Sequence, residues 1–283
     1  SVLLRTASGI HAEHSSQYIR NIQMNKESEI TQAIIKSNPY MVEESVWSAS
    51  GTDVVISFPI IPHQGSYFKD NLYGVKHLDL VKKAQKYWVV EGTNEELCAD
   101  EGIRHNVSNT IIVDDWDDVE KYVFENRYSF SGISFLAPSG DKDYNQAPNT
   151  AVITAEDMVD KYGEGAIFAS GMVVDALKVF TNLWIACSTA QGMGEDLTLE
   201  SSENSAKQDW VRRFSNFAHN YFEGDLKKTE YCLKDSYLLH KWNKIQQNLQ
   251  PVDWKTDLTE KTYVDVDTLG AAACAGGACE IDF

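Results

Sequence analysis

Apolar residues in the first half of the chain follow two spacings that alternate along the sequence. Short runs rich in β-branched residues predict strands, and apolar residues three or four positions apart predict helices between them. Interleaved strands and helices are typical of an α/β structure with at least partly parallel strands, but spacing alone does not separate an open sheet from a barrel. The predicted strands are 17–24, 53–59, 107–113 and 132–137, and the predicted helices are 78–90 and one that opens in the acidic run 114–118.

Each of these two helices has one apolar side. The acidic residues at the start of the second helix suit the positive end of a helix dipole. We expect the apolar sides to face the core, which buries Leu78, Val81, Ala84 and Trp88 on the first helix and Trp116, Val119 and Val123 on the second.

The final third of the chain is predicted to be helical. Thr154 and Asp157 have the spacing of a capping box, with Asp in place of the usual Glu or Gln. Three apolar or aromatic stripes follow at helical spacing, and such stripes are far more often core than cofactor site. They are Val173, Leu177, Phe180, Trp184 and Cys187 up to Gly192, then Trp210, Phe214, Phe217, Tyr221 and Phe222 up to Gly224, and finally Leu238, Trp242, Ile245 and Leu249 up to Pro251.

Composition narrows the possible functions. With 283 residues and 43% apolar content, the chain can bury a substantial core. A formal net charge of −17 argues against a nucleic-acid partner, since phosphate backbones are bound by clustered Lys and Arg. No apolar run is long enough to cross a bilayer, so we expect no membrane partner and a soluble, cytoplasmic protein. Cys98, Cys187 and Cys232 are widely spaced, as expected for reduced thiols.

The most specific chemical signal is a pair of cysteines at the end of the sequence. Cys274 and Cys279 are separated by Ala-Gly-Gly-Ala, and glycine lets such a segment close a disulfide with little strain. Residues 259–273 lack apolar periodicity, so we interpret 259–283 as a flexible arm that carries a thiol shuttle. A metal site and an inert small-residue tail are the alternatives. His11 and His14 offer two further metal ligands, although their spacing fits no strong zinc pattern.

Nine segments spread over nearly the whole chain carry a family resemblance. The chain resembles the C-terminal part of the monomeric, adenosylcobalamin-dependent (class II) ribonucleotide reductases. Reductases with a separate radical-generating subunit share the terminal dithiol, but they are similar to one another in having adjacent tyrosines, and no Tyr-Tyr pair occurs here. The segments are TASGIH (6–11), YIR (18–20), HNVSNT (105–110), SGISF (131–135), DYNQAP (143–148), SG (170–171), DWVRR (209–213), YCLKD (231–235) and CAGGAC (274–279).

The resemblance implies a fold and a reaction. Residues 1–258 would form the second half of a ten-stranded α/β barrel with its helical C-terminal part. The reaction would be thiyl-radical reduction of a ribonucleotide, here a ribonucleoside triphosphate, to the 2′-deoxyribonucleotide. In such enzymes two active-site cysteines become a disulfide in each turnover, and by matching position Cys274 and Cys279 would re-reduce it and pass the oxidation to a thioredoxin-like protein.

The resemblance also indicates binding residues. The family's phosphate-holding loop falls at or just before Ser1, which makes Ser1, Thr6, Ser8 and Gly9 candidate substrate-binding residues. The adenosyl group of adenosylcobalamin would lie against strands 107–113 and 132–137. The candidate cofactor-binding residues there are Asn106, Ser108 and Ser134.

One departure from the family pattern affects function. The thiyl cysteine, its neighbouring Glu and the two reducing cysteines lie upstream of the segment that Ser1 begins, so we expect activity only together with an N-terminal half. Three alternatives explain a start at Ser1: a split gene, an intein junction, or an artificial or proteolytic end within a longer chain. The functional alternatives are a dithiol redox or interaction protein without nucleotide chemistry, and an inactive remnant.

Overall fold

The computed structural model describes residues 9–100, 102–138, 144–192 and 202–257. Contacts between residues divide the chain into two compact units. Of the described residues, those within Ser1–Tyr18, Ile60–Tyr144 and Asn149–Ala151 form the first unit, and those within Ile19–Pro59, Asn145–Pro148 and Val152–Phe283 form the second.

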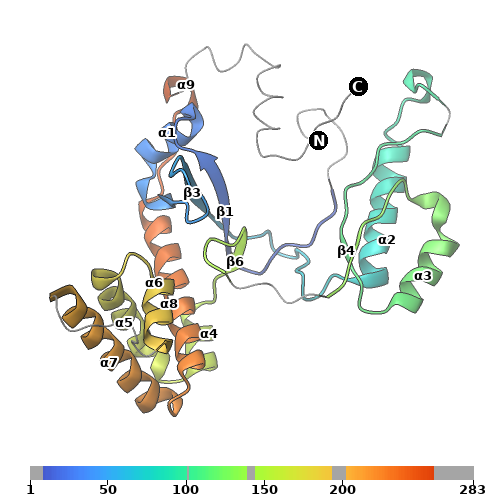
Figure 1. Cartoon of the computed structure of the whole chain (residues 1–283). Helices are drawn as coiled ribbons and strands as arrows, with labels where there is room; N and C mark the ends of the chain where they lie inside the picture. Colours follow the sequence, from blue (N-terminus) through green and yellow to red (C-terminus); the bar gives the residue numbers. More distant parts are fainter. Residues whose placement is uncertain (1–8, 101, 139–143, 193–201, 258–283) are drawn as a thin grey trace. The chain divides into compact units, whose positions relative to one another are not determined.

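The first unit is a small parallel α/β assembly (Figure 1). Strand β4 (Ile111–Ile112) pairs in parallel with β5 (Phe135–Leu136), and helix α3 (Trp116–Glu125) connects them. Ile10 forms a further parallel bridge with Asn109. The remaining elements are α2 (Gly74–Ala84), the π-helical turn η2 (Gln85–Val90), the short 3-10 helices η3 (Glu95–Leu97) and η4 (Arg127–Ser129), and β6 (Asn149–Ala151).

Burial alternates along the segment that leads into β4. Val107, Asn109, Ile111 and Val113 are buried, whereas the residues between them are exposed or partly exposed. The buried side chains pack against α2 and α3, where Leu78, Val81 and Val119 complete the core. The strand predicted over 107–113 is found in part: burial alternates over these residues, but only Ile111–Ile112 pair with β5.

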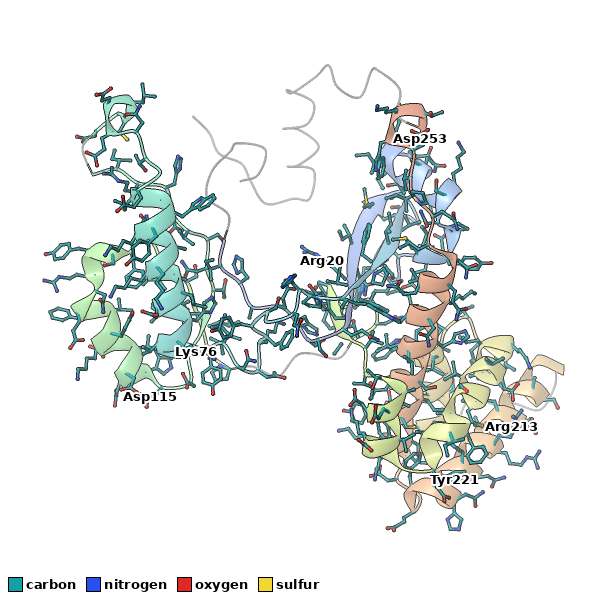
Figure 2. All side chains as sticks on the ribbon, turned by 180° about the vertical axis from the view of Figure 1, so that it is seen from behind. Arg20, Lys76, Asp115, Arg213, Tyr221 and Asp253 are labelled. Atoms are coloured by element: carbon teal, nitrogen blue, oxygen red, sulfur yellow. The ribbon has the colours of Figure 1, made fainter. Side chains whose placement is uncertain are left out.

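Helix α3 begins as the acidic run predicts. Asp115, labelled in Figure 2, is its N-cap, and its carboxylate accepts hydrogen bonds from the backbone N–H groups of Asp117 (2.9 Å) and Asp118 (3.2 Å). Val119 is buried as expected, but Trp116 is 55% exposed. The expectation that Trp116 is buried was therefore wrong. Its ring packs edge-on against the Phe135 ring, with centroids 5.9 Å apart, and remains largely exposed.

The helix predicted over 78–90 begins earlier and changes character within its range. It begins at Gly74 and becomes π-helical from Gln85 to Val90. Leu78 and Val81 are buried as predicted, but Trp88 is 73% exposed and Val89 is buried in its place. A π turn has more residues per turn than an α-helix, so extrapolating the α-helical spacing selected the wrong residue.

The second unit contains a small sheet. Strands β2 (Val42–Glu44), β3 (Asp53–Ile60) and β1 (Tyr18–Asn25) are neighbours in that order, and β2 is antiparallel to β3 with Val42 opposite Ile56. Helix α1 (Glu29–Ser37) and the 3-10 helix η1 (Pro39–Met41) connect β1 to β2. Ile34, Val54 and Ile56 form an apolar cluster with Ile245. The strands predicted over 17–24 and 53–59 are confirmed.

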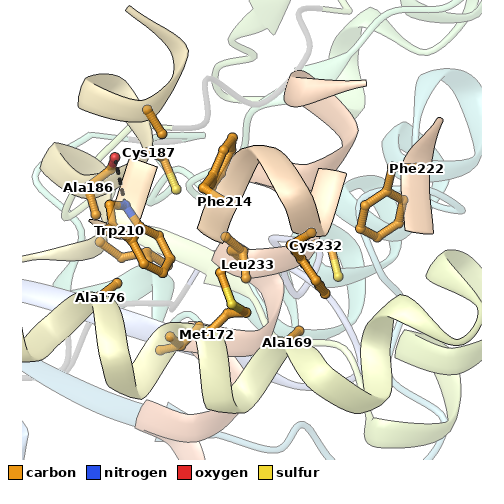
Figure 3. Close-up of a cluster of buried hydrophobic side chains, with 14 of the residues drawn as sticks. Ala169, Met172, Ala176, Ala186, Cys187, Trp210, Phe214, Phe222, Cys232 and Leu233 are labelled. Carbon is orange, nitrogen blue, oxygen red and sulfur yellow. Dashed lines mark hydrogen bonds between the residues drawn. The ribbon is translucent and has the colours of Figure 1, made fainter. Parts of the chain in front are cut away.

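The larger part of the second unit is helical (Figure 1). Trp210, Phe214, Phe217 and Phe222 are buried on α7 and form the predicted aromatic stripe, with Leu233 of α8 among them (Figure 3). The predicted capping box is confirmed, because Thr154 Oγ1 accepts from Asp157 N (3.1 Å) and Asp157 Oδ2 accepts from Thr154 N (3.3 Å). The helices are α4 (Ala155–Tyr162), α5 (Gly165–Val179), α6 (Leu183–Gln191), α7 (Ser202–Phe222), α8 (Leu226–Asn248) and α9 (Trp254–Asp257).

The stripe from Val173 to Cys187 is divided between two helices. Helix α5 ends at Val179, and α6 begins after Asn182, whose side-chain oxygen accepts from Ile185 N (2.9 Å). Phe180 is buried beside Trp210 in the break. Across the described residues, no single helix is long and apolar enough to span a bilayer, and α5 with α6 reaches that length only as a pair bent by 95°.

The predicted fold class is borne out at its coarse level. The described ranges form a mixed α/β structure with small sheets and contain no closed barrel. The ten-stranded barrel therefore stays a proposal. The predicted arm, 259–283, lies outside the described residues.

Candidate functional site

Four of the candidate binding residues lie within the described part of the first unit. They are Gly9, Asn106, Ser108 and Ser134, on three segments that are far apart in sequence. We call 9–11, 106–109 and 132–134 together the three-segment site. The other candidates, Ser1, Thr6, Ser8, Cys274 and Cys279, lie outside the described residues.

The first contact within the site joins 9–11 to Ser108. Ile10 N donates to Ser108 O at 2.9 Å, and the His11 ring nitrogen Nε2 lies 3.4 Å from Ser108 Oγ. A Cβ on Gly9 would lie 2.5 Å from His11 Nε2 and 2.7 Å from Ser108 O. Only glycine therefore allows the chain to pass this close to the neighbouring strand.

The second contact is the side chain of Asn109, which is buried between two strands. Its Nδ2 donates to the carbonyl oxygens of Val107 (2.8 Å) and Gly132 (2.9 Å), and its Oδ1 accepts from Ser134 N (3.2 Å). These backbone groups lie outside the paired residues of β4 and β5, Ile111–Ile112 and Phe135–Leu136. Asn109 therefore fixes the register between the two predicted cofactor-binding segments, a role that the sequence alone did not reveal.

The candidate side chains share the exposed face of these strands. Asn106, Ser108 and Ser134 are exposed, and a Cβ on Gly132 would lie 3.5 Å from the Asn106 side-chain amide. The opposite face is buried under α2 and α3. The site thus offers one amide and two hydroxyl groups on an open surface, which are neutral hydrogen-bonding groups.

A buried histidine supports the site from behind. His77 is 2% exposed, and its Nε2 lies 2.9 Å from Ile10 O; since a carbonyl oxygen only accepts, Nε2 carries the proton. Nδ1 has no hydrogen-bond partner among the described atoms. Burial lowers the pKa of His77, the hydrogen bond to Ile10 raises it, and His11 lowers it further. His77 is therefore a neutral residue that holds Ile10 in place, a role that no pattern in the sequence indicates.

The internal cysteines are poorly suited to thiol exchange. Cys187 and Cys232 are buried in the helical core (Figure 3), and burial raises the pKa of each thiol to about 12. Thiolate is the reactive form, so these residues stay unreactive near neutral pH. Cys98 is partly exposed, and its sulfur lies 3.5 Å from Asn94 O.

The histidines considered as metal ligands have other contacts. His11 faces Ser108, and the His14 ring packs against Tyr18 with centroids 5.6 Å apart. Within the described ranges, no group of three or more His, Cys, Asp or Glu residues is arranged to hold a metal ion.

In the second unit, residues 145–148 are hydrogen-bonded to β1. They belong to the segment DYNQAP, which is part of the family resemblance. Asn21 of β1 donates through its backbone to Pro148 O (2.9 Å) and through Nδ2 to Ala147 O (2.7 Å). Gln146, with a φ of 60°, donates to Glu44 O at 2.7 Å. The conformation of 145–148 is therefore defined by side-chain amides, as at Asn109.

Two more segments of the family resemblance, YCLKD and DWVRR, contribute side chains that connect helices. On α8, Asp235 accepts from Tyr162 Oη (2.7 Å) and Lys161 Nζ (2.9 Å) of α4. On α7, Arg213, labelled in Figure 2, pairs with Asp175 of α5. These contacts position helices and do not form a site.

No known protein family, curated protein or solved structure matches the chain. What the chain does must therefore be inferred from its own residues and their arrangement.

Proposed function

We propose that this chain is the C-terminal part of an adenosylcobalamin-dependent ribonucleoside-triphosphate reductase and works only together with an N-terminal half. It would supply part of the catalytic barrel and the terminal dithiol that re-reduces the active site. We place it in the cytoplasm, where thioredoxin-type reductants act.

One observation supports this proposal most directly. Three of the segments that resemble the reductase family, TASGIH, HNVSNT and SGISF, meet in one parallel assembly. His11 and Ser108 are 97 residues apart in sequence, and Asn109 and Gly132 are 23 apart, yet both pairs are in contact. Parallel strands that are covered by helices on one face suit the wall of an α/β barrel, whose other face would point to the interior. In this arrangement the polar side chains of the three-segment site would line the catalytic space.

The residues of the exposed face suit the proposed cofactor in their chemistry. The amide of Asn106 and the hydroxyls of Ser108 and Ser134 can donate to and accept from purine nitrogens and ribose hydroxyls. When bound, adenosylcobalamin would supply the radical that starts the reaction. The residues of this chain would bind and orient the adenosyl group, and Gly9 would let the 9–11 segment approach the substrate.

Electron supply would depend on Cys274 and Cys279. One thiolate of the pair attacks the active-site disulfide on the N-terminal half, and the second thiolate resolves the mixed disulfide. The active site then regains two thiols while the pair becomes a disulfide, which thioredoxin reduces with two electrons. The buried thiols of Cys187 and Cys232 are unsuited to replace this pair.

The test is reconstitution. The chain is co-expressed with the N-terminal half and assayed with a ribonucleoside triphosphate, adenosylcobalamin and thioredoxin, and deoxyribonucleotide is measured. We expect turnover only when both halves are present. Cys274→Ser and Cys279→Ser should abolish turnover with thioredoxin but preserve turnover with a small dithiol that enters the site, whereas Cys98→Ser should change neither.

Two outcomes would contradict the proposal. If the halves stay separate at micromolar concentration and no deoxyribonucleotide forms, the chain is not part of a reductase. If the chain still exchanges disulfides with thioredoxin under those conditions, it is a dithiol redox protein instead.

A further inference from the structure

A cavity of about 510 Å³ lies in the first unit, where η2 meets the chain that leads into β4 and β5. Its lining includes residues from the end of α2, from η2, from 102–104 and from 128–131. Asn106, Ser108 and Ser134 of the three-segment site do not line it. Its size is within the range of small-molecule sites. We call it the basic cavity because of its charges.

Three cations line the basic cavity: Lys82, Lys86 and Arg104. The described lining residues include no carboxylate, although the whole chain has 42 acidic residues against 25 basic ones. Lys82 and Lys86 are four positions apart at the end of α2 and the start of η2, so they share one side of the helix and repel each other. Within the described residues neither forms an ion pair, and Lys82 Nζ donates to the neutral Asn126 Oδ1 (2.6 Å).

Arg104 is held in position by contacts at the edge of the cavity. Its side chain is 13% exposed, its Nη1 donates to Ile103 O at 2.9 Å, and its Nη2 pairs with Glu95, whose side chain is 66% exposed. Arginine has five N–H donors, so these contacts leave donors for a ligand. A fixed guanidinium beside two lysines is the arrangement that phosphate groups prefer.

The inner wall of the cavity is formed around one buried amide. Gln85 is 5% exposed, and its Nε2 donates to His105 O (3.0 Å) and Ser131 Oγ (3.1 Å). Its Oε1 accepts from Val107 N (3.4 Å). The amide thereby ties the π turn to the starts of both strand segments.

The rim of the cavity offers apolar and aromatic surface. Tyr128 is 89% exposed, and the Arg127 guanidinium lies 4.6 Å from its ring centroid. Ile103 and Val90, 57% and 41% exposed, also line the cavity. A flat ring could stack on Tyr128, since the aromatic side chain has little cover from its own chain.

We propose that the basic cavity binds an organic phosphate that carries a flat aromatic ring, a class that nucleotides represent. Lys82, Lys86 and Arg104 bind the phosphates, and Tyr128, Val90 and Ile103 contact the ring. Inorganic phosphate would fill only the cationic part. The inference does not depend on the proposed function, because it concerns other residues and needs no N-terminal half.

Calorimetric titration of the full chain with ATP, inorganic phosphate and adenosine tests this inference. We expect ATP to bind more tightly than either fragment. Lys86→Gln should weaken ATP binding about tenfold, which corresponds to one lost charge-assisted contact. The matched control is Lys83→Gln, which removes the same charge from the same helix, but at a residue outside the lining that pairs with Asp79.

A second variant tests the contact with the ring separately from the contacts with the phosphates. Tyr128→Ala should weaken ATP binding and leave phosphate binding unchanged, because only the ring contact is lost. The proposal is overturned if ATP does not bind, if Lys83→Gln and Lys86→Gln weaken binding equally, or if neither Lys86→Gln nor Tyr128→Ala has an effect. All of these side chains are at the surface or rim, and circular dichroism checks that each variant is folded.

Discussion

The two units of this chain differ in how completely their helices cover the apolar core. In the second unit, α5, α7 and α8 surround a core in which Phe214 and Leu233 are fully buried (Figure 3). In the first unit, α2 and α3 cover one face of the parallel segments, and Asn106, Ser108 and Ser134 lie exposed on the other. The apolar core of the second unit is thus enclosed by helices, whereas the first unit leaves one face of its parallel segments exposed.

The difference also concerns polar groups. The helical part of the second unit is defined mainly by apolar packing, as in the aromatic stripe of α7. The first unit depends on buried polar side chains, namely Asn109, Gln85 and His77, which join segments distant in sequence. Apolar packing contributes most of the stability of a fold, while buried polar networks specify one geometry. Substitutions should therefore affect stability most in the second unit and geometry most in the first.

The largest effect is expected from Phe214→Ala. Phe214 is fully buried, and its removal leaves a cavity among Trp210, Leu233 and the neighbouring helices, which should lower the free energy of unfolding by about 3–5 kcal/mol. Urea unfolding followed by circular dichroism measures the change. Phe168→Ala is the control, because Phe168 is 52% exposed on α5 and should cost less than about 1.5 kcal/mol. Equal losses in both variants would contradict a closed apolar core.

Asn109→Ala should have the next largest effect. It removes the two hydrogen bonds donated to Val107 O and Gly132 O and the one accepted from Ser134 N, which costs about 2–4 kcal/mol. The measurement is hydrogen exchange of the Ile111 amide, which donates to Ser134 O at 2.8 Å. Asn106→Ala, on the exposed face, should change protection by less than about 0.5 kcal/mol. Unchanged protection in Asn109→Ala would show that strand pairing alone holds the register.

Gly9→Ala should act locally. Its Cβ would lie 2.7 Å from Ser108 O, a backbone atom, so the 9–11 segment must move away and lose the Ile10 N to Ser108 O hydrogen bond. We expect exchange of the Ile10 amide to accelerate about tenfold or more, since overpacking typically costs about 1–3 kcal/mol. Gly171→Ala is the matched control, because nothing lies within 4 Å of the added Cβ in α5, and it should stabilise the helix by about 0.5–1 kcal/mol. Slow exchange of Ile10 in Gly9→Ala would exclude the close approach.

Local signals in the sequence predicted the features that depend on local geometry. The capping box at Thr154, the N-cap at the start of α3 and the stripe of α7 all follow from residues within one or two helical turns. The strand over 107–113 was predicted from its β-branched residues, but the open face of the first unit was not. The converging positions of Asn106, Ser108 and Ser134 came from the resemblance.

Features set by distant contacts were missed. Spacing alone does not distinguish a buried Trp from one that packs on a rim, so Trp88 and Trp116 were both placed wrongly. The break between α5 and α6 falls at Phe180, whose apolar side chain continues the helical spacing although the backbone turns. His77 was missed because its partner, Ile10 O, is 67 residues away in sequence.

The smallest effect at pH 7 is expected from His77→Gln, whose consequence is a changed pH dependence. The pKa of His77 is lowered below its ordinary 6.5 in the folded protein, so the unfolded chain binds the proton more readily. The stability of the first unit is therefore fully present above about pH 6.5 and is lost as the pH falls through the folded pKa. The glutamine amide can still donate to Ile10 O but does not titrate, so it should remove this loss.

The protection factor of the Ile111 amide, followed from pH 7 to pH 5, measures the effect of His77. We expect wild-type protection to fall over this range and His77→Gln protection to fall less. His63→Gln is the control, because it also removes one histidine but at an exposed position of the same unit. If His77→Gln keeps the wild-type slope of protection against pH, the proton is taken up elsewhere and His77 is not the source of the pH dependence of the first unit.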